Sequence, residues 1–429
     1  MRCPLFNTGT KPCKNCQNLF GKRHAGHLGG GNVGIECIDR TAIVYNTDAM
    51  VYAAYDAIAA APDADRKELQ QLLGIKFNQF GIMSDPWLRS IYLPVTHNIR
   101  DWMHMLVSGG CANTLCAIVL NALGRHRISL DMVGTFIETF TLPSRHGKPS
   151  AKWVGRKRLG KKRDSLASFS GIMLSLIPIL NCFLAEVITA DHPMADHAKC
   201  FDLLTRIVGI LGLGPSVVLD HLDVLGSLID EWGAVYVALC RPADIKPKFH
   251  NFYVHMIGDI NKVGKLLSCF VTERKHRTTK RAALFTFRAI DNAVGKNLLH
   301  RQCESFITNG DCLFSRKYLI NAREVAFSDG TVAMYSTQSI LPCGLLKSKD
   351  IVWLASGDLG KIVRFWSSSP ETSAVQLETY TPVNADKTRW DISSPVLVCA
   401  DTDDIVDAVA WGVISDTCIR ILKPCLALV

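Results

Sequence analysis

The sequence predicts an α+β protein in which a long, mainly helical part precedes a small β-rich C-terminal domain. Leu, Ile and Val recur at helical spacing through residues 164–240. From about residue 326 the pattern changes to short alternating runs of β-branched residues, divided by Gly, Pro, Ser and Asp. A hydrophobic content of 48% is enough for one large core or several ordinary ones. We therefore expect three parts, which are 1–36, 37–325 and 326–429.

The helical part starts from a loop rich in Gly, Cys and His, where "GHLGGGNVG" contains too much glycine for regular structure. An Ala-rich stretch from Asp39 to Gly81 then predicts two helices that separate at Pro62. An apolar helix follows the double glycine at 109–110, and the long helical block is interrupted at "LGLGPS" and ends at Pro242.

The C-terminal domain contains segments such as "DIVWLASGDLGKIVRFW" and "SAVQLETYTPV", which predict short strands arranged as a barrel. Residues 350–429 contain eleven Asp or Glu and six Lys or Arg, a net charge of −5. This charge argues against DNA contact by the domain and leaves contacts with other proteins open.

The net charge of +9 is concentrated in two runs. Residues 145–163 contain nine Lys or Arg and no acid, and residues 273–281 contain five with one Glu. Local basicity of this kind is typical of a polyanion contact, although a solvated loop or a nuclear localisation signal also fits. The cations that we assign to DNA binding are Lys152, Arg156, Lys157, Arg158, Lys161, Lys162, Arg163, Arg274, Lys275, Arg277, Lys280 and Arg281.

The sixteen cysteines are scattered without a regular framework, which indicates free thiols in a reducing compartment. The most apolar run, "GIMLSLIPILNCFLA", is shorter than the roughly 20 residues that a membrane span requires. It also contains Pro178 and Asn181. We therefore expect a buried helix and no contact with a membrane.

A zinc site is predicted in the N-terminal loop. Cys13 and Cys16 form a C-x2-C pair, and His24 and His27 follow as H-x2-H, with Cys37 as a substitute for one histidine. Two thiolates and two imidazoles suit tetrahedral zinc, although the short H-x2-H spacing is awkward. The alternative is a pair of reduced cysteines in a turn.

Two further patterns give weaker indications of metal binding or catalysis. His250 and His255 follow a proline break beside two lysines, and we interpret them as core histidines in preference to a metal pair. Cys111 opens a helix after two glycines, with His104 nearby, which suggests a cysteine hydrolase or acyltransferase. No orienting residue accompanies Cys111, so a buried small residue is the alternative.

Asp101 and Glu273 are candidates for two-metal chemistry. Phosphodiester cleavage uses carboxylates that converge on two hard cations, Mg²⁺ or Mn²⁺. Asp101 precedes an apolar helix, and Glu273 heads a cationic segment that would keep the acid ionised.

Four segments in order carry a family resemblance: "GTKPCKNCQN", "LPVTHNIRDWMHMLVSGG", "IKPKFHNFYVH" and "LLSCFVTERKHRTTKRA". In this order the chain resembles transposase-derived proteins of large eukaryotic DNA transposons of the DDE type, near the CACTA and Plavaka-like groups. Such families show D-x-M-H or D-x-L-H, then Pro-Lys-x-His, then E-x-x-H-x-x-x-K, and tend to end in a β-rich domain. The similarity covers most of the chain.

The resemblance implies an incomplete ribonuclease-H-like core with a long helical insertion at about 123–245. Asp101 would match the second catalytic acid, at the end of a core strand, and Glu273 the third, with His104 and His276 as their companions. In such families the first aspartate lies upstream of the G-T-K-P-C loop, whereas this chain starts eight residues before Gly9. We therefore expect an N-terminally truncated, catalytically incomplete remnant.

The expected protein is nuclear, binds DNA and is a possible homo-oligomer. The competing interpretation is a non-enzymatic module that binds nucleic acid or protein. An intact set of acids would favour the enzyme.

Overall fold

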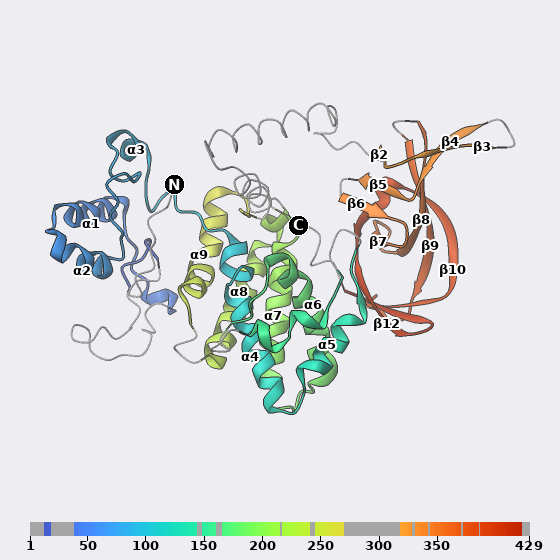
Figure 1. The fold of residues 1–429 in the computed structure, drawn as a ribbon, viewed down its shortest axis with the longest axis horizontal. Helices are drawn as coiled ribbons and strands as arrows, with labels where there is room; N and C mark the ends of the chain where they lie inside the picture. The colour runs from blue at the N-terminus through green and yellow to red at the C-terminus, as the bar shows by residue number, and fades with distance from the viewer. Residues whose placement is uncertain are drawn as a thin grey trace, which may run out of the picture. The chain divides into compact units, whose positions relative to one another are not determined.

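The computed structural model describes residues 13–18, 38–143, 148–159, 165–214, 217–240, 245–269, 318–327, 331–341, 344–369, 372–385 and 387–422. Helices occupy the first part and antiparallel strands the last, which confirms the α+β prediction and its order (Figure 1). The chain divides into two compact units. The first contains 1–128, 156–173 and 184–268, and the second contains 129–155, 174–183 and 269–429.

The first unit begins with three short helices, α1 (Asp48–Ala60), α2 (Asp63–Leu73) and α3 (Pro86–Ile91). The predicted break at Pro62 is confirmed, because α1 ends just before it and α2 starts directly after it. Gly74 ends α2 with a φ of 67°, a conformation that glycine adopts without strain. These helices share a small core of Val51, Tyr55, Ile58, Ile75 and Met83.

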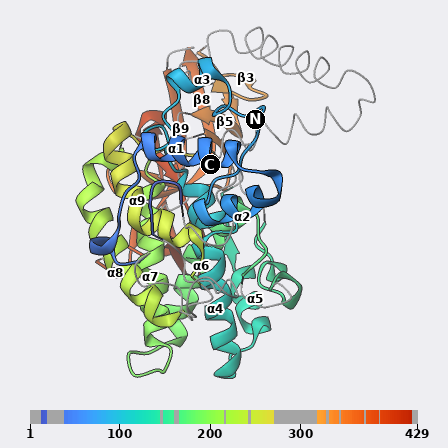
Figure 2. The ribbon, with the colours of Figure 1, turned by 90° about the vertical axis from the view of Figure 1, so that its left-hand side faces the viewer.

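A helical bundle forms the rest of the first unit, where α7 packs against α4 and α8, and α8 packs against α9 (Figures 1 and 2). Its aromatic rings interlock around Trp232, which lies 5.5 Å from Phe249 between ring centroids. The helices are α4 (Cys111–Arg125), α7 (Ala195–Leu211), α8 (Leu222–Leu239) and α9 (Pro247–Val263).

The second unit includes helical residues from the middle of the chain, in 129–155 and 174–183. In it, α5 (Leu130–Glu138) leads into β1 (Phe140–Thr141), which pairs antiparallel with β12 (Ala410–Ser415). Phe140 lies opposite Gly412, where a Cβ would meet the phenyl ring at 3.0 Å. A segment predicted to belong to the helical insertion therefore contributes a strand to the C-terminal sheet.

The C-terminal sheet is antiparallel and strongly curved. Its ten strands run in the order β1-β12-β13-β10-β9-β8-β4-β3, with β7 and β11 paired beside β8, and β2, β5 and β6 form a second sheet. The strands are β2 (Tyr318–Leu319), β3 (Arg323–Ala326), β4 (Val332–Ser336), β5 (Gln338–Leu341), β6 (Gly344–Lys347), β7 (Ile351–Leu354), β8 (Leu359–Ser369), β9 (Thr372–Pro382), β10 (Arg389–Asp401), β11 (Ile405–Ala408), β12 (Ala410–Ser415) and β13 (Cys418–Leu422).

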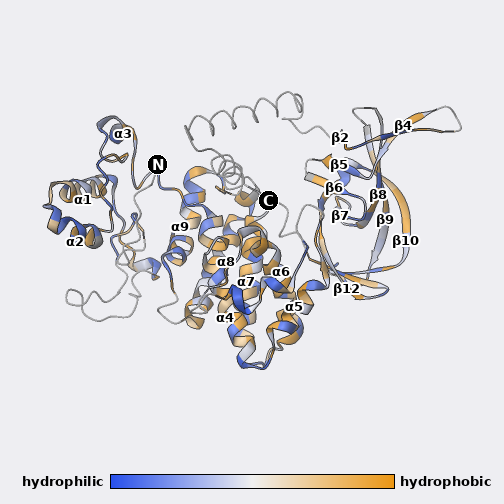
Figure 3. Ribbon diagram, in the orientation of Figure 1, coloured by the Kyte–Doolittle hydropathy of each residue, from blue (hydrophilic) through white to orange (hydrophobic). Residues whose placement is uncertain are grey.

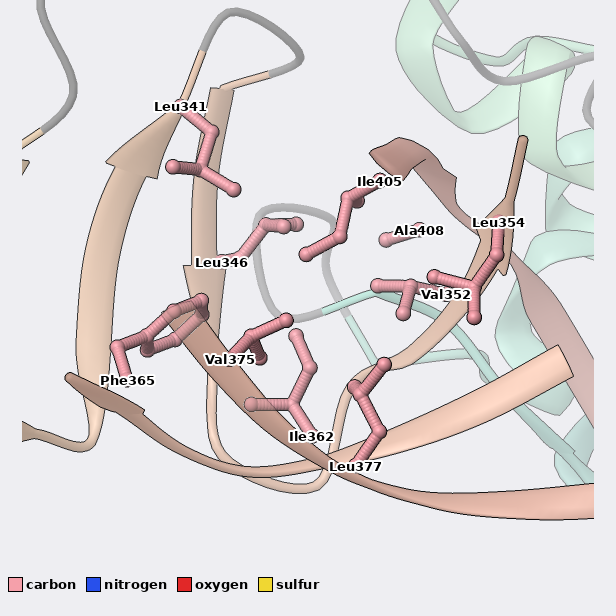
Figure 4. Close-up of a cluster of buried hydrophobic side chains, with 10 residues drawn as sticks. All are labelled: Leu341, Leu346, Val352, Leu354, Ile362, Phe365, Val375, Leu377, Ile405 and Ala408. Carbon is pink, nitrogen blue, oxygen red and sulfur yellow. The ribbon is translucent and has the colours of Figure 1, made fainter. Parts of the chain in front are cut away.

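The core of this unit lies on the inner side of the curved sheet. Apolar side chains from six strands converge there (Figure 4). They are Leu341, Leu346, Val352, Leu354, Ile362, Phe365, Val375, Leu377, Ile405 and Ala408. Period-2 alternation in β9, which contributes Val375 and Leu377, therefore places one face of this strand in the core.

Two helical stretches, Met103–Arg125 and α6 (Ser170–Val187), are long and apolar enough to cross a membrane (Figure 3). Within the protein, 78% and 56% of their most apolar windows are buried. Core helices pass the same test of length and composition, so these helices are weak evidence for a membrane span.

Candidate metal centre

The cysteine loop, residues 13–18, is held against the segment that leads into α1. Cys16 forms an antiparallel bridge with Tyr45, and the Gln17 N–H donates to the Val44 carbonyl at 2.8 Å. The Asn46 side chain donates to the carbonyls of Lys14, at 2.7 Å, and Cys16, at 3.1 Å. Hydrogen bonds to backbone groups thus fix the conformation of the C-x2-C turn.

The two histidines come from α9, whose first residue is Pro247. Proline is favoured at this position because its fixed φ suits a helix. A backbone N–H in the first turn would have no partner within the helix, so its loss costs nothing. His250 and His255 lie five positions apart on α9, and their side chains are buried. Their Nε2 atoms are 3.0 Å apart, so both rings point to one place.

The two cysteines meet the two histidines within one unit of the fold. Cys13 Sγ lies 3.3 Å from Nε2 of each histidine, and Cys16 Sγ lies 3.4 Å from His250 Nε2 and 3.2 Å from His255 Nε2. A tetrahedral zinc ion would separate sulfur and nitrogen ligands by about 3.5 Å and the two nitrogens by about 3.3 Å. The observed distances are within about 0.3 Å of that arrangement. The group could therefore hold a metal such as zinc.

Hydrogen bonding and burial favour the metal-binding forms of Cys13 and His255. Cys13 is 4% exposed, Cys16 0%, His250 1% and His255 6%. The hydrogen bond from Cys16, assisted by His250 and His255, lowers the pKa of Cys13 far below its usual value despite the opposing effect of burial. Burial lowers the pKa of His255. Thiolate sulfur and neutral imidazole are the species that coordinate zinc.

The zinc prediction was therefore half complete. Cys13 and Cys16 lie in a candidate metal group, but the histidines beside them are His250 and His255, which were expected to be core residues. His24, His27 and Cys37 lie outside the described residues. The missed signal was spacing, because C-x2-C and H-x4-H each match a half of a Cys2His2 zinc site. Cys16 and His250 are 234 positions apart, which concealed the match.

Asp101 lies just before the π-helical turn Met103–Val107. Its carboxylate accepts a hydrogen bond from the Met103 N–H at 3.1 Å and contacts His104 Nδ1, at the start of that turn. The expected core strand before Asp101 is not observed. Between residues 38 and 269, the described segments contain one strand, β1. Glu273 and His276 lie outside the described residues, so the Mg²⁺ or Mn²⁺ site stays a prediction.

Part of the first basic run lies within the described residues. Lys152, Arg156 and Lys157 are exposed on two short 3-10 turns, Ala151–Trp153 and Arg156–Arg158, and Arg158 is half-buried. The intervening Trp153 and Val154 are buried. The other predicted DNA-binding cations lie outside the described residues, namely Lys161, Lys162, Arg163, Arg274, Lys275, Arg277, Lys280 and Arg281.

Cys111 is a buried residue at the start of α4. Its side chain is 3% exposed, and burial raises the pKa of its thiol to about 12. The thiolate is the nucleophilic form, and an apolar environment disfavours it. These properties favour the alternative of a buried small residue over a hydrolase nucleophile.

No protein-family model matches this sequence, and neither a curated protein nor a solved structure matches it. The transposase resemblance therefore stays an expectation from short motifs. The strongest functional feature of the described residues is the buried Cys2His2 group.

Proposed function

We propose that Cys13, Cys16, His250 and His255 hold a structural zinc ion that fastens the N-terminal loop to α9. The observation that carries this proposal is the convergence of four buried ligand atoms, all within 4.8 Å of one another. Four protein ligands complete the tetrahedral coordination of zinc and leave no open position for water or substrate. The centre would thus supply folding free energy and take no part in catalysis.

Hydrogen bonds hold the described part of the loop, residues 13–18, but its apolar contacts are few. The apolar cluster around it consists of Cys13, Cys16 and Ile43, with Val254 packed against them, and two of its three buried members are the proposed ligands. A structural zinc ion contributes roughly 10–16 kcal/mol of apparent binding free energy, which can order a loop that lacks its own core. Coordination would replace the missing apolar contacts.

The protein as a whole is proposed to be a DNA-binding protein related to the DDE transposases. The exposed side chains of Arg156 and Lys157 support this proposal. No acidic residue interrupts the run 145–163. Lysine and arginine without acidic neighbours bind phosphates and release counterions. Nuclear localisation and association of identical copies belong to the same proposal.

Strand cleavage is not part of the proposed function. The resemblance supplies Asp101 and Glu273, and two-metal chemistry needs enough carboxylates to hold both ions. A ribonuclease-H-like core also needs a sheet. The described residues between 38 and 269 contribute one strand, β1, so the other strands would have to come from elsewhere in the chain. Mg²⁺-dependent nicking of DNA that Asp101→Ala abolishes would contradict this limit.

A second candidate function is a non-enzymatic module that binds proteins. The acidic C-terminal part, with a net charge of −5 over residues 350–429, favours a basic protein surface as its partner. Loss of DNA binding together with retained capture of a basic protein would favour this module over the DNA-binding proposal.

The zinc proposal is tested by metal analysis of the protein purified under reducing conditions. We expect about one zinc per chain in the wild type and well under half of that in Cys16→Ser and His250→Ala. Cys116→Ala is the matched control, because it changes a buried cysteine of α4 outside the metal group. Equal zinc content in all four proteins, or none in the wild type, would reject the site.

A further inference from the structure

A short segment, residues 98–100, contacts both halves of the metal centre without supplying a ligand. Asn98 reaches the cysteine loop, and Arg100 reaches α9. The segment follows the α1–α3 helices and directly precedes Asp101. It therefore connects two parts of the chain that the proposed metal ion would also connect.

On the helix side, Arg100 forms hydrogen bonds and an ion pair with α9 near the two histidines. Its Nη1 donates to the Asp259 carboxylate at 2.9 and 3.2 Å, and its backbone N–H donates to the same carboxylate at 3.0 Å. Its Nε donates to the Asn251 side chain at 2.8 Å. Asn251 directly follows His250, and Asp259 lies one helical turn after His255. The contacts of Arg100 thus lie next to His250 and one turn beyond His255.

The ion pair between Arg100 and Asp259 is buried, with side chains 6% and 10% exposed. Removing one partner of a buried pair leaves an uncompensated charge and is strongly destabilising, so both side chains must stay in place. The guanidinium uses separate nitrogens for Asp259 and Asn251. A lysine, with one ammonium on a flexible stem, does not reproduce that fork.

On the loop side, Asn98 Nδ2 donates to Asn15 Oδ1 at 2.9 Å. Asn15 lies between the two cysteines and is buried. Its backbone carbonyl accepts a hydrogen bond from the backbone N–H of Asn46 at 2.8 Å. Movement of Asn98 would therefore be transmitted to the turn that sets the spacing of the two thiolates.

We infer that Asn98 and Arg100 are positioning residues of the metal centre, which align the cysteine loop with the two histidines of α9. This inference rests on the proposed zinc site. Hydrogen bonds to metal ligands orient them, and their loss typically costs about 10- to 100-fold in metal affinity. Asn98 and Arg100 act one contact further out, through Asn15 and through Asn251 and Asp259, so the lower end of that range is expected. The two residues divide the task, because Asn98 acts on the loop and Arg100 on the helix.

The test uses the full chain with cobalt(II) in place of zinc, because tetrahedral cobalt reports ligand geometry in its visible absorption. Affinity is measured by competition with a chelator. We expect Asn98→Ala and Arg100→Lys to lower cobalt affinity about 10-fold and to shift the visible bands. Arg89→Lys is the matched control, since Arg89 also forms a two-bond pair in the same unit, with Asp56 at 2.6 Å, and both side chains are partly exposed.

The outcomes separate this inference from the zinc proposal. A wild type without a tetrahedral cobalt spectrum would overturn the zinc site and the positioning role with it. A wild type that binds cobalt, with Asn98→Ala unchanged in affinity and spectrum, would overturn the positioning role alone. Asn98→Ala decides this point even if Arg100→Lys fails to fold, because it leaves the buried ion pair intact.

Discussion

Replacing Gly233 by alanine is expected to force α8 away from α9. A Cβ at this position would lie 2.2 Å from Cε2 and 2.5 Å from Cδ2 of Tyr253. Carbon atoms pack at about 3.5 Å or more, so the ring or the helix would have to move by about 1.3 Å. The Tyr253 ring is held on two sides, because Phe249 stacks on it with centroids 5.3 Å apart and the Arg40 guanidinium lies 4.3 Å from its centre.

The magnitude follows from a comparison within one helix. Gly226 also lies in α8, and a Cβ there would meet nothing within 4 Å. Gly226→Ala should therefore stabilise the protein by up to about 1 kcal/mol through helix propensity. Gly233→Ala gains the same propensity but loses about 1–3 kcal/mol to overpacking. The difference between the two variants isolates the steric effect.

The assay is urea unfolding of the wild type and both variants with zinc present, followed by measurement of zinc affinity. Tyr253 lies between His250 and His255 on α9, so displacement of α9 should also weaken metal binding. Gly233→Ala should unfold at lower urea than Gly226→Ala. If both variants are equally stable, the close approach of α8 and α9 at Gly233 is wrong.

Two other outcomes are expected. Replacing residues 156–158 by alanine should weaken DNA binding and reduce the slope of log affinity against log salt by up to about 2.7, since three phosphate contacts are lost. Fluorescence anisotropy at several salt concentrations measures this, and an unchanged slope indicates a solvated surface or a localisation signal. Burial by itself would raise the pKa of Asp48. Hydrogen bonds from Thr96 and from the Val95 N–H lower this pKa by a larger amount, so the net shift is downward. Its stabilising effect should be complete above about pH 4 and lost as pH falls through the folded-state pKa, and Asp48→Asn should flatten that loss in acid unfolding experiments.

Local patterns were sufficient for much of the helical part. The break at Pro62 and the helix after the glycines at 109–110 depend on residues within one turn, and both are observed. The strand Phe140–Thr141 was missed because two residues carry no periodicity. Its partner lies in β12, far along the chain, so only the folded sheet reveals the pairing.

The metal centre shows the same limit. The C-x2-C turn is local and was recognised, whereas His250 and His255 were assigned to the core because they lie among apolar residues of α9. They are buried, as that interpretation required, and they also face the cysteines. Burial and ligation are compatible for histidine, so an apolar surrounding does not exclude a metal ligand.

The energies explain why a metal would be useful at this position. Bringing Cys16 to His250 across 234 positions costs roughly 5 kcal/mol of loop-closure entropy if the intervening chain is unfolded. The bundle and the contacts of Arg100 offset part of that cost before any metal binds. The apolar cluster at the loop is small, and a structural zinc ion contributes roughly twice that entropy or more. Zinc would therefore convert a loop that touches α9 into one that is fixed on it.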